Sequence, residues 1–194
     1  MAQKTDLRII KTERAIRETF IELMYEDGFE NIKIQQILDG ALINRSTFYA
    51  HYQDKYDLRN RIEEDLLEGL AERARSSFSA KDAGSTFNEE SIRNYLSNML
   101  EYLNENRELV SYLFGPDGDP AFAQKLGNKT HEVWSSEDLL PHLNLPENYV
   151  FAGLSGMVSG ILTEWARSGF KEEKSGVIDV LYSLLTGISK VIIR

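Results

Sequence analysis

The sequence predicts an all-α protein with an N-terminal three-helix domain, residues 1–54, and a larger C-terminal helical domain, residues 55–194. Two observations predict this class. Apolar residues recur at three- and four-residue spacing along the chain, which is the period of an amphipathic helix. Helix-capping residues, glycines and prolines separate these segments. With 42% hydrophobic and 27% charged residues, the chain has the composition of an ordinary soluble globular protein.

The first helix is expected from about Asp6, with Thr5 as a candidate cap, to Asp27, where Gly28 ends it. One face carries an apolar stripe that can pack on the following elements, formed by Ile9, Ile16, Phe20 and Leu23.

The stretch 34–58 has the pattern of two short helices, a tight turn and the start of a longer helix. The first short helix has one apolar face, formed by Ile34, Ile37, Leu38 and Ala41. Asn44 is a good N-cap for the second helix, residues 45–52, because its side-chain oxygen can accept an orphan backbone amide. Phe48 and Tyr52, four residues apart, are expected to be buried. Asp54 is expected to cap the third helix, with Asp57 three residues later.

The polar side of the second short helix suits DNA. Side chains of these types contact base edges and phosphates when a helix lies in a major groove. The polar side is formed by Arg45, Ser46, Thr47, Tyr49 and His51. An ordinary helical hairpin with a polar face fits the same spacing, so the pattern alone leaves both interpretations open.

The run 44–52, followed by Asp54-Lys55 and Leu58, resembles the signature of the TetR family of bacterial transcriptional regulators. Upstream, Asp27-Gly28-Phe29 and Gln36-Ile37 are similar to that family as well. The resemblance covers about the first third of the chain, and the remainder is similar in length and all-helical pattern. It implies a helix-turn-helix DNA-binding domain, a homodimer, a palindromic double-stranded DNA operator and a C-terminal domain that dimerises and binds a small effector.

The resemblance also implies individual DNA contacts. Tyr49, His51 and Lys55 match positions that contact phosphates in the family, whereas the residues just before them on the helix are expected to read bases. The expected DNA-binding residues are Lys33, Gln35, Asn44, Arg45, Ser46, Thr47, Tyr49, His51 and Lys55.

Two residues depart from the family pattern. Lys33 stands where the family usually has a threonine that caps the helix and touches phosphate; a lysine cannot cap, but its ammonium can reach a phosphate. Leu42 stands where the turn usually has glycine, so a turn without a positive φ is expected.

The net charge of −9 is unevenly distributed. Residues 1–60 contain nine Lys/Arg and ten Asp/Glu, a net charge of −1, and the remaining 13 and 21 give −8. A nearly neutral N-terminal part is compatible with DNA binding through a local basic face. The chain has no cysteine, no apolar run near the ~20 residues of a membrane span and no signal peptide, so a cytoplasmic protein without membrane contact is expected.

Six further helices are expected, at about 54–77, 88–104, 107–114, 120–134, 147–168 and 175–193. Glycines inside the fifth of these cost about 1 kcal/mol each relative to alanine, so a close helix contact is expected there. The last helix is apolar on two sides, one of which can meet another subunit. The alternative is a fully internal helix in a monomer. The expected dimer-interface residues are Gly153, Gly156, Gly160, Leu181, Leu184 and Ile188.

Aromatic and methionine side chains concentrate in the C-terminal domain. Core packing explains any single one of them, but the family resemblance implies a pocket for a small apolar effector. The expected lining residues are Tyr95, Met99, Tyr102, Phe122, His131, Trp134 and Trp165. The acidic charge of this domain favours a neutral or cationic compound over an anionic one.

The sequence contains no metal-binding motif, phosphate loop or nucleophile motif, so neither an enzyme nor a cofactor is expected. The function that these observations favour is a ligand-responsive, dimeric, DNA-binding repressor. The alternative is a TetR-like adaptor or coactivator that acts through a protein partner. The nearly neutral N-terminal part, Lys33 and Leu42 leave that alternative open.

Overall fold

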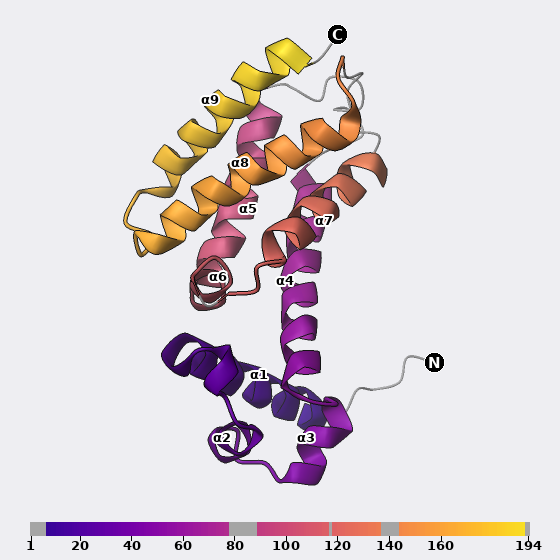
Figure 1. Cartoon of the computed structure of the whole chain (residues 1–194), viewed down its shortest axis with the longest axis vertical. Helices are drawn as coiled ribbons and strands as arrows, with labels where there is room; N and C mark the ends of the chain where they lie inside the picture. The colour runs from indigo at the N-terminus through magenta and orange to yellow at the C-terminus, as the bar shows by residue number, and fades with distance from the viewer. Residues whose placement is uncertain (1–6, 78–88, 117, 137–143, 193–194) are drawn as a thin grey trace. The chain divides into compact units, whose positions relative to one another are not determined.

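The computed structural model describes residues 7–77, 89–116, 118–136 and 144–192, and within these ranges it contains helices and no strand. The predicted all-α class is confirmed (Figure 1). The helices are α1 (Leu7–Asp27), the short 3₁₀ helix η1 (Phe29–Asn31), α2 (Ile34–Gly40), α3 (Arg45–His51), α4 (Lys55–Ser77), α5 (Glu89–Glu105), α6 (Arg107–Leu113), α7 (Phe122–Ser136), α8 (Glu147–Arg167) and α9 (Lys174–Ile192). The candidate cap Thr5 and the run 79–86 lie outside the described residues. None of the helices in the described ranges is long and apolar enough to cross a membrane.

The chain divides into two compact units, Met1–Asp65 and Leu66–Arg194, which we call unit 1 and unit 2. The division falls inside α4, so the first half of this helix belongs to unit 1. The predicted functional boundary between residues 54 and 55 stays a prediction.

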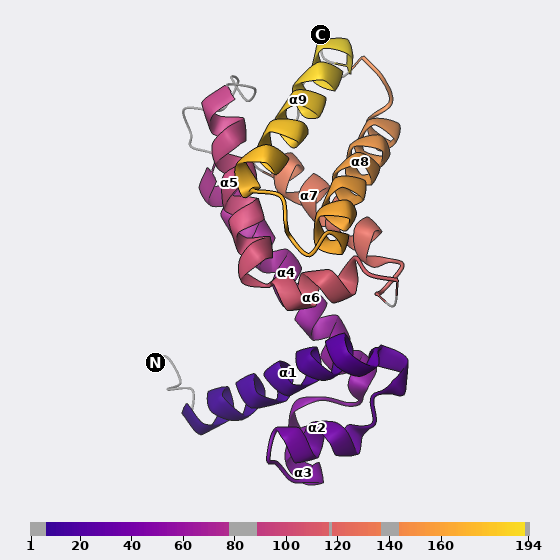
Figure 2. The same ribbon diagram turned by 90° about the vertical axis from the view of Figure 1, so that its left-hand side faces the viewer.

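In unit 1, α2 and α3 lie together on one side of α1 (Figure 2). The core contains apolar residues from α1, η1, α2, the α3 region and the first half of α4: Ile16, Phe20, Met24, Phe29, Ile37, Leu38, Phe48, Tyr52, Leu58 and Ile62. The burial of Phe48 and Tyr52 was predicted and is confirmed. The prediction for Ile9 is wrong, because the N-terminal turns of α1 bury no side chain and Ile9 is 48% exposed.

In unit 2, α5 packs on α9, α7 on α8, and α8 on both α6 and α9. The second half of α4 adds Ala71 and Ala74, which form a small core cluster with Val133. Gly69 on α4 makes room for the ring of Tyr102 on α5, because a Cβ atom there would lie 2.1 Å from the hydroxyl oxygen of Tyr102.

Candidate nucleic-acid interface and apolar pocket

The N-terminus of α3 is organised by one oxygen atom. Asn44 Oδ1 accepts hydrogen bonds from the backbone N–H of Thr47 at 2.8 Å, the Ser46 hydroxyl at 2.7 Å and the Thr47 hydroxyl at 2.9 Å. The predicted N-cap is therefore confirmed. The cap fixes the direction of both hydroxyls at the end of the helix that carries Arg45.

The two sides of α3 differ sharply. Phe48 is completely buried and anchors the helix in unit 1. The opposite side is available to a partner, with Arg45, Ser46 and Tyr49 exposed and Thr47 and His51 half-buried. A short helix with a polar, exposed N-terminal face is the geometry that reads a major groove. Which of these residues contact DNA stays a prediction.

The start of α2 is held by half of a capping box. The side chain of Gln36 accepts the backbone N–H of Lys33 at 2.8 Å and donates to Asp27 Oδ2 at 3.0 Å. A lysine ammonium has no acceptor, so Lys33 cannot supply the other half. Its exposed side chain remains available for DNA, whereas the side chain of Gln35, which is also exposed, donates from Nε2 to Asp39 Oδ1 at 2.8 Å.

The turn between α2 and α3 corrects one prediction. Leu42 has a φ of 54°, so the turn does use the left-handed conformation that was expected to be absent. The N–H of Ile43 donates to the carbonyl of Leu38 at 3.0 Å and the N–H of Leu42 to that of Asp39 at 3.4 Å. These bonds are the Schellman motif that ends a helix, and its hydrogen bonds require the conformation whichever residue is present.

Lys55 has unexpected partners. Its ammonium donates to the backbone carbonyls of Phe29 and Glu30 at 3.0 Å each and to that of Ile32 at 3.1 Å. It also lies 4.7 Å from the centre of the Phe29 ring. A lysine has three N–H donors, and all three are used here. The structure thus gives Lys55 a positioning role, holding η1 and the start of α2 against α4, and its contact with phosphate stays a prediction.

We expect Lys55→Met to lower the free energy of unfolding by roughly 2 kcal/mol, because three carbonyls lose charged hydrogen-bond donors. The slope of log affinity for DNA against log salt concentration should not change, since no phosphate contact is lost. The matched control is Lys33→Met, which removes an exposed ammonium and should lower that slope by about one unit without a loss of stability. A lower slope for Lys55→Met in salt titrations would instead place this ammonium on a phosphate.

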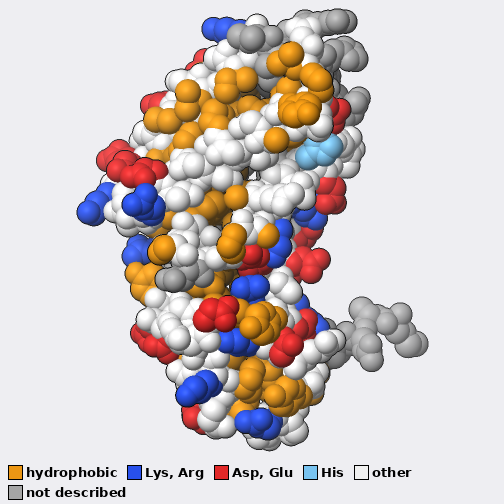
Figure 3. Space-filling model, in the orientation of Figure 1, with side chains coloured by type: hydrophobic (Ala, Val, Ile, Leu, Met, Phe, Trp, Pro, Cys, Tyr) orange, Lys and Arg blue, Asp and Glu red, His pale blue; other side chains and the backbone are white. Residues whose placement is uncertain are grey.

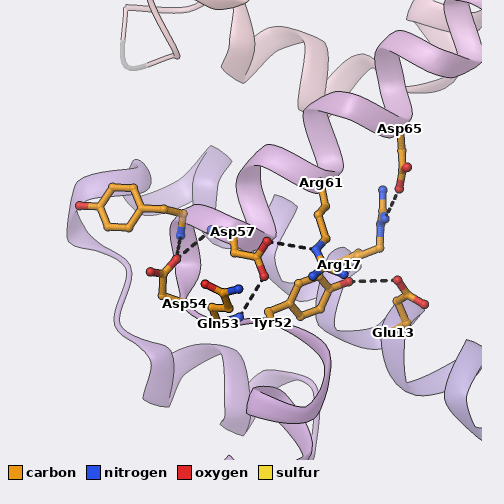
Figure 4. Close-up of polar contacts among 9 residues, drawn as sticks. Glu13, Arg17, Tyr52, Gln53, Asp54, Asp57, Arg61 and Asp65 are labelled. Atoms are coloured by element: carbon orange, nitrogen blue, oxygen red, sulfur yellow. Dashed lines mark hydrogen bonds and ion pairs between the residues drawn. The ribbon is translucent and has the colours of Figure 1, made fainter.

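The N-terminus of α4 carries the predicted cap (Figure 4). Asp54 Oδ1 accepts the backbone N–H groups of Tyr56 and Asp57, each at 2.8 Å. Asp57 in turn accepts the backbone N–H of Gln53 at 2.9 Å and the guanidinium of Arg61 at 3.1 Å. These two contacts lower the pKa of Asp57, the backbone hydrogen bond being the larger cause. The carboxylate therefore stays ionised where α3 passes into α4.

A second polar group ties α3 to α1 and was not predicted. The Tyr52 hydroxyl donates to Glu13 Oε1 at 3.3 Å, while Arg17 forms an ion pair with Asp65 and Arg61 lies 5.3 Å from the Tyr52 ring (Figure 4). Burial, and then the charge of Glu13, raise the pKa of Tyr52 to about 12. The neutral phenol fixes the C-terminal end of α3. Glu13 and Arg17 carry no local sequence signal, because nothing in α1 identifies a partner some 40 residues away.

Unit 2 contains an apolar pocket of about 60 Å³ between α5, α7, α8 and α9. It is lined by Tyr95, Leu96, Met99, Leu126, Gly127, Thr130, Trp134, Phe151, Leu154, Ser155, Val158, Ser159 and Leu185. None of these lining residues carries a charge at neutral pH, since burial raises the pKa of Tyr95 to about 12. Tyr95, Met99 and Trp134 were expected to line a pocket and do so here.

The other four residues that were expected to line the pocket have structural contacts outside it. The Arg73 guanidinium lies 3.8 Å from the centre of the Tyr102 ring, and Phe122 is buried against Phe114. His131 hydrogen-bonds Glu147 at 2.6 Å, and the Trp165 indole donates to the Glu172 carbonyl at 3.0 Å. These four were expected in the pocket because aromatic residues concentrate in this domain and the family resemblance implies an effector pocket, and neither observation separates a structural contact from a cavity lining.

An exposed face of α8 and α9 carries most of the residues expected at a dimer interface. Gly153, Gly156 and Gly160 are exposed, and a Cβ atom at any of them would meet nothing within 4 Å. Figure 3 shows hydrophobic side chains gathered over these two helices, and the exposed apolar residues include Tyr149, Val180 and Leu184. We call this surface the α8–α9 face. Ile188 is half-buried, whereas Leu181 is completely buried in the core of unit 2 and does not belong to this face.

Comparisons with known proteins agree with this geometry. A family model of the TetR type, described as a transcriptional regulator C-terminal region, matches residues 90–187, half of the chain. The uncharacterized HTH-type transcriptional regulator YxbF of Bacillus subtilis (strain 168) is 25% identical over 101 residues, which are 52% of this chain and 26% of that protein. The chain therefore spans about a quarter of the length of this relative.

Solved structures show the same fold. A TetR transcriptional regulator from Streptococcus agalactiae 2603V has 24% sequence identity and a TM-score of 0.68, covering 92% of this chain and 96% of that one. NalD, the secondary repressor of the MexAB-OprM multidrug efflux pump in Pseudomonas aeruginosa, has 19% identity and a TM-score of 0.68, covering 97% and 99%. Together with the family match, which lies outside the N-terminal motif, these similarities identify the chain: it belongs to the TetR family of transcriptional regulators.

Proposed function

We propose that this DNA-binding regulator is a homodimeric repressor that binds a palindromic operator and is released by a small apolar effector. The observation that carries the proposal is the exposed polar face of α3, whose N-terminus is capped by Asn44. The helix presents Arg45, Ser46 and Thr47 to base edges, while Tyr49 and His51 lie further along it, where they can reach phosphates. Lys33 and Gln35, which are exposed at the start of α2, add contacts with the phosphate backbone of the DNA.

The α8–α9 face supports the proposed dimer. Glycines on one helix and apolar side chains on its neighbour form an exposed surface that a second copy of the chain can bury. A two-fold dimer places two α3 helices in successive major grooves, about 34 Å apart, so its operator is a palindrome. NalD, which has the same fold, is a repressor, and this supports negative control here.

The pocket in unit 2 supports the proposed effector. A charged ligand would be buried among uncharged side chains at a high cost in desolvation, so the pocket favours a neutral compound. The rings of Tyr95 and Trp134, which meet edge to face with centres 6.3 Å apart, give the pocket an aromatic wall that suits an apolar molecule. This narrows the expectation of a neutral or cationic ligand to a neutral one.

Selection of bound duplexes from a random-sequence pool tests the proposal. We expect an enriched palindromic sequence that is bound with a salt-dependent affinity. Arg45→Ala should weaken this binding and relax the base preference at one position of each half-site. Asn94→Ala, an exposed substitution on α5, is the matched control and should leave binding unchanged. If no sequence is enriched while the protein is folded and dimeric, regulation through a protein partner replaces the proposal.

A further inference from the structure

Leu42 is unfavourable in the free protein on two counts. Its φ of 54° lies in the left-handed region, where a residue with a Cβ atom is strained. Its side chain is also 92% exposed, the highest value among the large hydrophobic residues of the described chain. The backbone hydrogen bonds of the Schellman motif offset the strain, but the leucine side chain itself contributes no buried contact. Glycine would form the same backbone hydrogen bonds without the strain, so the fold does not explain why leucine stands here, which points to a role of the side chain in binding.

The position of Leu42 suggests which partner it contacts. It lies two residues before the cap Asn44, at the same end of α3 as Arg45. In a helix-turn-helix this end of the recognition helix meets the base edges of the major groove. The exposed side chain of Leu42, on the turn just before this end, would therefore lie in the same groove. This step rests on the proposed DNA-binding function.

The chemistry of Leu42 limits what it can recognise there. Its neighbours Asn44, Arg45 and Ser46 provide hydrogen-bond donors and acceptors, whereas Leu42 provides only an apolar surface. The one apolar group on the major-groove edges of the bases is the C5-methyl group of thymine. We propose that Leu42 is a specificity-determining residue that packs against a thymine methyl group beside the bases read by α3.

Deoxyuridine substitution tests this contact, because it removes the methyl group and leaves base pairing intact. In a synthetic duplex of the sequence enriched from the random pool, each thymidine is replaced in turn by deoxyuridine. We expect the wild-type protein to lose affinity about fourfold at one thymine of a half-site, the value of one buried methyl group. Leu42→Gly and Leu42→Asn, which both tolerate the left-handed turn, should show no loss at that position and unchanged losses elsewhere.

Two controls separate the contact from an effect on the turn. Leu145→Ser removes an exposed leucine in unit 2 and should leave every deoxyuridine response unchanged. Leu42→Gly should also raise the melting temperature of the free protein, since the strain is relieved. Greater stability with lost methyl discrimination supports the contact. If wild type and Leu42→Gly respond equally at every thymine, the Leu42 contact is refuted but the proposed function is not. If a folded protein enriches no sequence, both the contact and the proposed function are refuted.

Discussion

Replacing Gly156 with leucine should convert the protein from a dimer into a monomer and lower its affinity for a two-half-site operator roughly a hundredfold or more. In the proposed complex each half-site binds one α3 helix, so a monomer would lose the gain in effective concentration that the second DNA-binding domain of a dimer provides. This is the largest effect that we expect from a single substitution.

The structure makes this substitution a clean test of assembly. A Cβ atom at Gly156 meets nothing within 4 Å, so a side chain there does not disturb the packing of unit 2. Leucine also has a higher helix propensity than glycine by about 0.8 kcal/mol, which should stabilise α8 in the monomer. A leucine on the α8–α9 face would, however, hold two subunits apart where glycine backbones allow close contact.

Light scattering after gel filtration measures the assembly, and circular dichroism shows that the variant is folded. Asn94→Leu, which adds the same side chain to an exposed position of α5, should remain dimeric. Gly127→Leu is the opposite control, because a Cβ atom there lies 2.5 Å from Ser155 Oγ and the substitution should disturb unit 2 itself. A wild-type protein that is monomeric at micromolar concentration would rule out both the dimer and the palindromic operator.

The features of the candidate nucleic-acid interface that the sequence predicts are those that depend on residues close together in the chain. Asn44 caps α3, and Asp54 and Asp57 cap α4, because each cap joins atoms within four residues of one another. The burial of Phe48 and Tyr52 follows equally from their spacing. Such features depend only on the chain near them, so the positions of the motif helices could be inferred without coordinates.

The remaining features depend on contacts that are distant in sequence. Lys55 is held by carbonyls more than 20 residues away, and a lysine at the start of a helix has no signal that separates this role from phosphate binding. Leu181 and Leu184 belong to the same apolar pattern of α9. Only the packing of α9 within unit 2 shows that Leu181 is in the core and Leu184 is exposed. Leu42 differs again, because the hydrogen bonds of the Schellman motif override the conformational preference of the residue.

A neutral aromatic compound should shift the fluorescence of Trp134 and release operator DNA. We expect it to lower the affinity of the protein for the operator about 5- to 150-fold. The reason lies in the size of the pocket. Its volume of about 60 Å³ is less than half of the roughly 150 Å³ in which a protein cavity holds benzene. A ligand of that size can enter only if α5, α7 and α8 move apart.

This requirement links ligand binding to a change of state. A ligand that binds equally to two conformations shifts neither, however tightly it binds. Here the contracted pocket excludes the ligand and the widened pocket accepts it, so the affinities differ and the population moves towards the widened state. The ligand lowers DNA affinity to the extent that the contracted state is the one that binds DNA.

The variant Trp165→Phe makes the measurement specific, because it leaves Trp134 as the only indole, and Trp165 packs on Phe170 outside the pocket. In this background we expect saturable quenching by naphthalene but not by naphthalene carboxylate, whose charge would be buried among uncharged side chains. Val158→Phe narrows the pocket and should abolish both the quenching and the release of DNA while leaving DNA binding intact. Release of DNA that persists in Val158→Phe would show that the effector acts elsewhere. Quenching without release in any compound tested would mean that the contracted and widened states bind DNA equally well, and control would then have to come from a protein partner.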